Sequence, residues 1–341
     1  MSAIVNTALD LTAVPAASHE ALAFHRALPE YEPTPVRQLR DIAHELGLAA
    51  VLVKDESDRL GLPAFKVLGA SWAVERTLRN RPHVHTLVAA SAGNHGRAVA
   101  HVAAMRRLAC RIFLPARALP VRRAAILSEG AEVVVVDGSY EDAVTSAARD
   151  AQADGVALIA DVGEHGPAEW VIDGYATLFA EAAAQAAYDL ILVPVGVGSL
   201  AAAAARHGAE VGAAVVGVEP VTAACLATSL RRGQPIAVPT PGTTMAGLDC
   251  AEVSPAAWPT LRHGITGTVA ITDAQAEAAM QELAAAGLRI GESGAAALAG
   301  LRSLQMDGSC SDLRDRLRAD HHTNVLLIAT EGPTGASATP G

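Results

Sequence analysis

Long hydrophobic runs, paired cysteines and clustered positive charge are all missing from this 341-residue sequence. No uninterrupted apolar stretch reaches the roughly 20 residues that a membrane span needs, so none is expected. The four cysteines, Cys110, Cys225, Cys250 and Cys310, lie far apart and form no Cys-x-x-Cys pair. This spacing disfavours a disulfide framework or a zinc site. We therefore predict reduced thiols, no metal site and a cytoplasmic location.

Aromatic residues make up only 3% of the sequence, and the formal net charge is −10. An acidic chain without a basic stripe is not expected to have nucleic acid as its main partner. Residues 1–17 lack both a basic start and a continuous apolar segment, so we expect no secretory signal. The hydrophobic content of 51% is enough for a full core. Its bias toward Ala, Val and Leu suits helices packed on parallel sheets.

Short apolar strands alternate with helices along most of the chain. Residues 1–35, which include four prolines, are expected to be irregular. The alternating units of about 20–25 residues indicate right-handed βαβ crossovers, so we predict an α/β fold with parallel sheets. The predicted strands are 50–54, 86–90, 111–114, 132–136, 156–160, 190–194, 214–220, 269–271 and 325–329. The predicted helices are 37–46, 66–80, 97–108, 120–129, 140–154, 170–187, 274–286 and one that begins at Glu292.

A lysine occupies one of the strand-to-helix junctions. Lys66, with apolar Phe65 and Val67 beside it, is expected near a helix N-terminus, where desolvation and the positive end of the helix both disfavour its charged form. A neutral amine is a nucleophile, and a lysine amine condenses with an aldehyde to form a Schiff base. Most lysines near helix starts are simply solvated. Both interpretations stay open on this stretch alone.

A glycine-rich loop, Gly196-Val197-Gly198-Ser199, follows another predicted strand and opens a helix. Glycines let backbone amides approach an anion, and the helix dipole adds attraction, so the loop is either a phosphate cradle or a structural turn. The full Gly-x-Gly-x-x-Gly fingerprint fails because Ala202 stands at its last position. That failure disfavours a nicotinamide dehydrogenase.

Two more loops follow predicted strands, where ligands bind in open parallel sheets. The amides of residues 91–96 can hold a carboxylate, and Asn94 can bond a ring hydroxyl or a substrate, although Asn and Gly also suit plain turns. His95 is either a titrating group or a satisfied structural histidine. Thr330, at the end of the last strand, can face a neutral heterocycle nitrogen or bond locally.

Six segments resemble, in order, the tryptophan-synthase-β-like enzymes of fold type II, which use pyridoxal 5′-phosphate. Within that family the diaminopropionate ammonia-lyases are the most similar group. The likeness covers residues 30–335 approximately. The matching segments are Lys54-Asp55-Glu56-Ser57, Ala64-Phe65-Lys66-Val67-Leu68-Gly69-Ala70, Ser91-Ala92-Gly93-Asn94-His95-Gly96-Arg97, Val195-Gly196-Val197-Gly198-Ser199, Met245-Ala246-Gly247-Leu248 and Glu292-Ser293-Gly294-Ala295.

The resemblance implies two open, twisted, mostly parallel sheets flanked by helices. A large domain that binds the cofactor would comprise residues 1–84 and 185–341, and a small domain that binds the substrate would comprise 85–184. The family also implies a homodimer. The implied cofactor residues are Lys66, which would form the Schiff base, Phe65, Asn94 at the phenolic oxygen, Thr330 at the ring nitrogen, and Gly196, Val197, Gly198, Ser199 and Leu200 at the phosphate. The implied residues for the substrate carboxylate are Ser91, Ala92, Gly93, Asn94 and His95.

The implied activity is β-elimination on a small L-amino acid, such as 2,3-diaminopropionate, to give pyruvate and ammonia. Lys66 or Asp161 would take the α-proton, although Asp161 can also be a turn cap. A general acid must protonate the departing amine, and Glu164, His165 and Glu219 are candidates. The family carries an acid for the D-substrate before its Gly-Asn-His segment. Ala92 stands there in this chain, so we expect no activity on the D-isomer.

Three alternatives remain open. The first is a dehydratase of serine, threonine or hydroxyaspartate, with the same cofactor. The second is a synthase in specialised metabolism that replaces the β-substituent with an incoming nucleophile. The third is a binding protein on the same fold without catalysis, against which the intact Lys66 argues.

Overall fold

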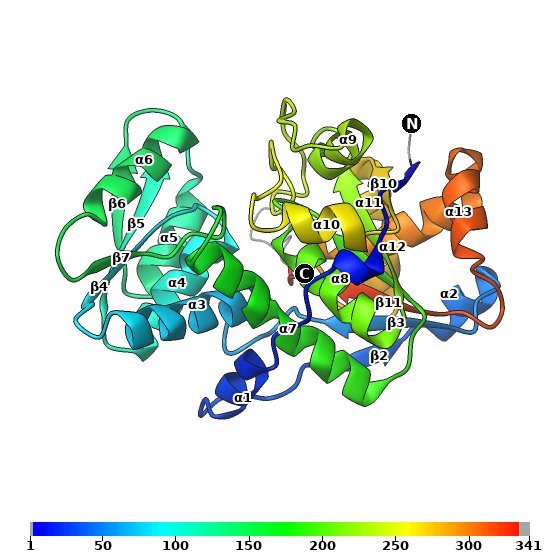
Figure 1. Ribbon diagram of the computed structural model, residues 1–341, viewed down its shortest axis with the longest axis horizontal. Coiled ribbons are helices and arrows are strands. Elements are labelled where there is room, and N and C mark those ends of the chain that lie inside the picture. Colours follow the sequence, from blue (N-terminus) through cyan, green and yellow to red (C-terminus); the bar gives the residue numbers. More distant parts are fainter. Residues whose placement is uncertain (1–2, 334–341) are drawn as a thin grey trace. The chain divides into compact units, whose positions relative to one another are not determined.

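The computed structural model describes residues 3–333 and shows two compact units (Figure 1). The chain up to Phe65 and from Tyr175 onward forms one unit, and Lys66 to Gly174 forms the other. The first contains a sheet of seven strands and the second a sheet of four. We call them the seven-stranded unit and the four-stranded unit.

The seven-stranded unit has the strand order β1-β10-β9-β8-β11-β3-β2. Its five central strands are parallel, and the two edge strands, β1 and β2, pair antiparallel with their neighbours. Its strands are β1 (Ala3–Val5), β2 (Val36–Gln38), β3 (Ala50–Asp55), β8 (Leu190–Pro194), β9 (Ala214–Pro220), β10 (Gly267–Ile271) and β11 (Asn324–Ala329). Its helices are η1 (Leu11–Ala13), α1 (Glu20–Arg26), α2 (Arg40–Glu45), α8 (Ser199–Val211), α9 (Cys225–Arg232), α10 (Trp258–Gly264), α11 (Asp273–Ala285), α12 (Glu292–Met306), η2 (Gly308–Cys310) and α13 (Ser311–Leu317). Helix α7 (Pro167–Gln185) has residues in both units.

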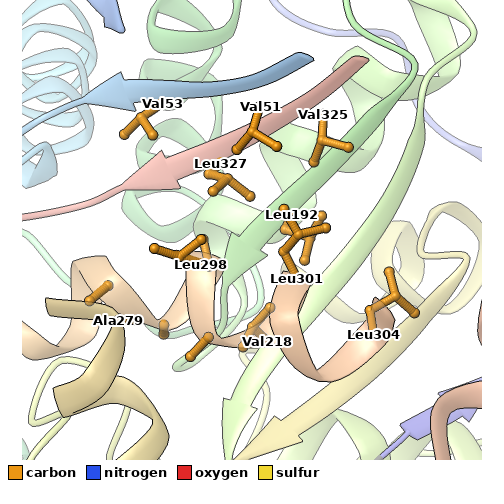
Figure 2. Packing of buried hydrophobic residues seen from close by; sticks show 14 of the residues in the cluster. Val51, Val53, Leu192, Val218, Ala279, Leu298, Leu301, Leu304, Val325 and Leu327 are labelled. Atoms are coloured by element: carbon orange, nitrogen blue, oxygen red, sulfur yellow. The ribbon is translucent and has the colours of Figure 1, made fainter. Parts of the chain in front are cut away.

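Helices cover both faces of this sheet because successive strand residues point to opposite sides. Figure 2 shows one face, where Val53 of β3 and Leu327 of β11 lie in the same buried cluster as Leu298 of α12. The other face carries α8, whose Gly208 lies against Val215 of β9. Strands buried on both faces read as continuous apolar runs, which is how the sequence revealed them.

The four-stranded unit is a parallel sheet in the order β6-β5-β4-β7. Gly96 of α4 lies against Ile112 of β5, and α6 packs on the opposite face around Phe113. Because β4 and β7 are neighbours, the loops that leave their carboxyl ends lie side by side. The elements are α3 (Lys66–Asn80), β4 (Thr86–Ala90), α4 (Asn94–Met105), β5 (Ala109–Pro115), α5 (Pro120–Ser128), β6 (Glu132–Val136), α6 (Tyr140–Asp150) and β7 (Val156–Leu158).

The two compact units do not have the bounds expected for the two domains, which were 1–84 with 185–341, and 85–184. The division falls after Phe65 and after Gly174 instead. Helix α3 packs against α4, and a Cβ on Gly174 would meet the Leu68 carbonyl oxygen at 2.6 Å. Close packing therefore groups the helix that begins with Lys66, and the start of α7, with the four-stranded unit.

The pattern of apolar residues along the chain does not reveal strands that form only by pairing with a strand distant in the sequence, and it does not reveal very short helices. The expectation that residues 1–35 are irregular is wrong in part, because β1 pairs with β10 and α1 occupies 20–26. The predicted helix 37–46 begins only at Arg40, since residues 36–38 pair with β3 as β2. Helices α9, α10 and α13 are too short for periodicity to reveal. Among residues 3–333, no helix is long and apolar enough to cross a membrane.

Candidate active site

Lys66 is the first residue of α3, and its amine pairs with the carboxylate of Asp161. Lys66 Nζ donates to Asp161 Oδ2 at 3.1 Å, although the two residues lie 95 positions apart in the sequence. The side chains are 20% and 16% exposed, so the pair is partly accessible. The structure thus brings together the two residues that the sequence analysis proposed for proton transfer.

Sheet topology brings Asp161 to this position. The backbone amide of Ile159 donates to the Val88 carbonyl at 2.8 Å, which extends the pairing of β7 with β4 by one residue. The chain then leaves the sheet and carries Asp161 beside the start of α4. There the ring of His95 lies with Nδ1 3.9 Å from Asp161 Oδ2. Asp161 therefore faces two basic side chains, from α3 and α4.

These neighbours control the charge of Asp161. Burial pushes the pKa of the carboxyl group upward, but the charges of His95 and Lys66 and the hydrogen bond from Lys66 outweigh it and lower the pKa to about 2. Asp161 is therefore ionised at neutral pH. An ionised carboxylate can accept a proton, as a general base must.

The segment expected to bind the substrate carboxylate, residues 91–95, connects β4 to α4. Ser91, Ala92 and Gly93 form the loop, and Asn94 and His95 are the first two helical residues. The Gly93 amide donates to Ser91 Oγ at 3.2 Å. The amides of the first helical turn have no intrahelical acceptors, so the helix start can receive an anion.

The glycine-rich loop lies in the seven-stranded unit, between β8 and α8. Gly198 is the N-cap residue with φ of 91°, a left-handed conformation that favours glycine. A Cβ at Gly196 would lie 2.8 Å from the Gly247 carbonyl oxygen, so the loop at 245–248 is packed directly against it. Ser199 and Leu200 are the first residues of α8 and are buried. The amides of this first helical turn have no intrahelical acceptors, so the helix start can receive an anion such as a phosphate.

Thr330 directly follows β11 and is buried in the same unit. Its carbonyl oxygen accepts a hydrogen bond from the Phe65 amide at 3.2 Å. The Phe65 ring packs against Tyr175, with centroids 4.7 Å apart. Within this unit, Thr330 therefore lies beside the residue that immediately precedes Lys66 in the chain.

Two more segments belong to this cluster, and the sequence analysis assigned them no role. The Gly247 amide donates to Ser293 Oγ at 3.1 Å. A Cβ at Gly294 would meet the Glu331 carbonyl oxygen at 2.9 Å, so α12 approaches the end of β11 closely. The resemblance had marked both segments, at 245–248 and 292–295. Only the packing shows that they surround the glycine-rich loop and Thr330.

The candidate general acids lie in different environments. Glu164 and His165 are exposed, and His165 Nδ1 lies 3.4 Å from Glu169. Glu219 is fully buried at the end of β9 and accepts hydrogen bonds from the amides of Leu226 and Ala227. Burial raises the pKa of Glu219 to about 7, against these hydrogen bonds.

Comparison with known proteins identifies the family. A sequence model of the family described as "Pyridoxal-phosphate dependent enzyme" matches residues 27–328. The chain belongs to this family. Its expected α/β fold with two sheets, its fold type II resemblance and its pyridoxal 5′-phosphate cofactor are thereby confirmed.

Several family members are similar over nearly the whole chain. Diaminopropionate ammonia-lyase of Salmonella typhimurium is 35% identical over 93% of this chain and 89% of its own length. The crystal structure of diaminopropionate ammonia-lyase from Escherichia coli in complex with an aminoacrylate-PLP azomethine reaction intermediate aligns with a TM-score of 0.89 and 31% identity. That alignment covers 98% of this chain and 94% of the other. The biosynthetic L-threonine dehydratase of Escherichia coli is 29% identical, and only 53% of its length is covered.

One of the two lysines of this chain is suited to bind the cofactor. Enzymes of this family bind the cofactor aldehyde through a lysine amine, and the sequence contains two lysines, Lys54 and Lys66. Lys54 is fully buried, and its Nζ donates at 2.6 Å to both the Thr34 carbonyl and Glu181. Lys66 is partly exposed at a helix start. Lys66 is therefore the lysine that fits covalent binding, and the cradle at 196–200 fits the phosphate.

Proposed function

We propose that this chain is a pyridoxal-phosphate-dependent lyase that eliminates ammonia from 2,3-diaminopropionate, preferring the L-isomer, to give pyruvate and ammonia. The pair of Lys66 and Asp161 carries the proposal, because it places the lysine that would bind the cofactor beside a carboxylate that can accept a proton. Similarity to diaminopropionate ammonia-lyases over 93% of the chain supports the choice of substrate.

Residues from four segments of the chain would hold the cofactor. Lys66 would bind its aldehyde, Asn94 its phenolic oxygen, and residues 196–200 its phosphate. Phe65 would pack at the cofactor, and Thr330 would face its ring nitrogen. When bound, the cofactor withdraws electrons from the substrate Cα, and so makes the Cα proton acidic. A threonine hydroxyl does not keep the ring nitrogen protonated. This moderates electron withdrawal and favours elimination over racemisation or transamination.

The chain's own residues would handle the substrate and its protons. The backbone amides of residues 91–95 would bind the substrate carboxylate at the start of α4. Asp161 would take the Cα proton, with Lys66 as the alternative base. Ala92 offers no carboxylate for the D-isomer, so we propose that the chain is selective for L-amino acids.

The proposal includes a homodimer in the cytoplasm. The resemblance to this family supports the dimer. The four cysteines, all free in the structure, support a reducing compartment. Light scattering of the purified protein tests the dimer, because a monomeric mass would contradict it.

The decisive experiment is a visible spectrum followed by titration with L- and D-2,3-diaminopropionate, L-serine and L-threonine. The proposal expects a visible absorbance band that shifts with the L-diamine, release of pyruvate and ammonia, and no reaction with the D-isomer. Keto acid from serine or threonine alone would favour a dehydratase. A band without keto acid, and product only with an added nucleophile, would favour a β-replacement synthase.

A further inference from the structure

His95 is a buried histidine whose two ring nitrogens have different surroundings. Nε2 lies 2.8 Å from the carbonyl oxygen of Ile159. Nδ1 is also buried, and no residue in the described part of the chain forms a hydrogen bond with it. The carboxylate oxygen Oδ2 of Asp161 lies 3.9 Å from Nδ1. A buried ring nitrogen without a hydrogen bond is destabilising, so a functional reason is expected.

The contact with Ile159 determines which tautomer the ring adopts. A carbonyl oxygen only accepts hydrogen bonds, so Nε2 carries the hydrogen and the neutral ring presents a lone pair at Nδ1. That lone pair faces the carboxylate of Asp161, which is another acceptor. A separation of 3.9 Å is too long for a hydrogen bond. Nδ1 and Oδ2 are both acceptors and do not attract each other. A proton on either atom would make the contact attractive.

The surroundings of the ring lower the pKa of His95 overall, so the ring is neutral at neutral pH and Nδ1 carries a lone pair. Asp161 after β7 and Lys66 of α3 are the charged groups that act on His95. Burial lowers the pKa of His95 and Lys66 lowers it further, while Asp161 and the Ile159 carbonyl raise it. The pKa of Asp161 is about 2, since His95 and Lys66 outweigh the effect of burial. Lys66 also lowers the pKa of Asp161, so a proton captured by this carboxylate is released readily and a second acceptor beside it matters.

We propose that His95 is a positioning residue that accepts, at Nδ1, the proton that Asp161 takes from the substrate. This inference rests on the proposed function, in which Asp161 is the base. The Cα–H bond would break, its electron pair would stay on the substrate, and the proton would bond to Oδ2 of Asp161. The proton then passes to Nδ1, and the ring becomes a cation whose Nε2–H is still donated to Ile159.

The substitution His95→Gln separates this role from a structural one. A glutamine amide can still donate to the Ile159 carbonyl, but it offers no titrating nitrogen to Asp161. We expect kcat on the L-diamine to fall roughly 10- to 100-fold while KM and cofactor affinity stay within about 3-fold. The isotope effect with Cα-deuterated substrate should decrease, because the proton held on Asp161 returns to the substrate more often and a step after removal of the Cα proton limits the rate. His101→Gln, on the same helix but paired with Glu129 at 2.8 Å, is the matched control and should leave kcat unchanged.

A second measurement does not depend on activity. Nitrogen NMR of the full chain, with and without cofactor, reports the state of the His95 ring, whose signals are assigned by their loss in His95→Gln. Near neutral pH, Nε2 should carry the hydrogen and Nδ1 should not. Asp161→Asn should lower the pH midpoint of the His95 titration, because Asp161 raises the pKa of His95.

The outcomes distinguish this inference from the proposed function. If the wild-type chain is active and His95→Gln keeps its kcat within about 3-fold, the inference is wrong and the proposed function stands. A His95 midpoint that does not respond to Asp161→Asn also overturns the inference. If the wild-type chain does not act on the diamine but the midpoint moves as expected, the proposed function fails while the coupling of His95 to Asp161 stands.

Discussion

Each unit contains a cluster of candidate functional residues, and the two clusters differ in the chemical groups they present. In the seven-stranded unit the cluster consists largely of glycines and backbone groups. Gly196 and Gly294 lie so close to backbone oxygens that a side chain does not fit, and Gly247 packs against Ser293. In the four-stranded unit it consists of titratable side chains, Lys66, Asp161 and His95. Backbone amides provide a rigid surface for an anion, whereas side chains exchange protons. The difference predicts that variants in the first cluster change cofactor affinity, and variants in the second change rates.

Lys66→Ala should have the largest effect, because it removes the amine that would bind the cofactor. We expect turnover to fall roughly 10³-fold or more, with loss of the visible absorbance band. Lys66→Arg is the matched control, since it keeps a cation beside Asp161 but cannot form a Schiff base with the aldehyde. It should lose the band as well. Survival of the band and of turnover in either variant would contradict the role of Lys66.

Asp161→Asn comes next and tests whether the charged cluster transfers protons. Asparagine keeps the size of the side chain but accepts no proton, so kcat on the L-substrate should fall roughly 10²- to 10⁴-fold. The absorbance band and the cofactor dissociation constant should persist, which absorbance titration measures. Unchanged turnover would mean that Asp161 only caps the turn after β7.

The two units should respond to pH in opposite directions. The pKa of Asp161 is lowered to about 2, so its stabilisation is complete above pH 4 and is lost as the pH falls toward 2. The pKa of Glu219 is raised to about 7, so its carboxyl group stabilises the fold below pH 4.5 and this contribution is lost as the pH rises through 7. Each shift corresponds to about 2–3 kcal/mol of unfolding free energy.

Hydrogen exchange measures this contrast unit by unit, because it reports local opening free energies. Amides of β7 should lose protection in acid, and amides of β9 should lose it toward neutral pH. Asp161→Asn should flatten only the first trend, and Glu219→Gln only the second. A single pH trend shared by both strands would show that these two groups do not control the stability of their units.

Ser199→Ala should have the smallest effect and should change binding alone. Loss of one hydroxyl donor at the start of α8 removes about 1 kcal/mol, which weakens cofactor binding roughly 5- to 10-fold. The value of kcat at saturating cofactor should be unchanged. Ser309→Ala, at an exposed turn in η2 of the same unit, is the control and should not alter cofactor affinity. A fall in kcat for Ser199→Ala would contradict the prediction that variants in the first cluster change cofactor affinity alone.

Much of the fold could be predicted because its signals are local. The strands β4, β6 and β8 and the helix α3 have the bounds that the sequence pattern predicts, since apolar runs and helical spacing are properties of neighbouring residues. Strand β1 was missed because three residues with no distinctive pattern become a strand only by pairing with β10. The unit boundaries also differ from the expected domain bounds, because they depend on how α3 and α7 pack.

The sequence by itself determined the family, the α/β alternation and the candidate functional residues, because motifs and periodicity are properties of neighbouring residues in the chain. Only the tertiary structure decided which of these residues meet. The pairing of β4 with β7 brings His95 beside Asp161, and α3 adds Lys66 from 95 positions away. The order of strands in a sheet depends on the packing of the whole unit. The partners that set the charge of Asp161 and the tautomer of His95 could therefore not be read from neighbouring residues.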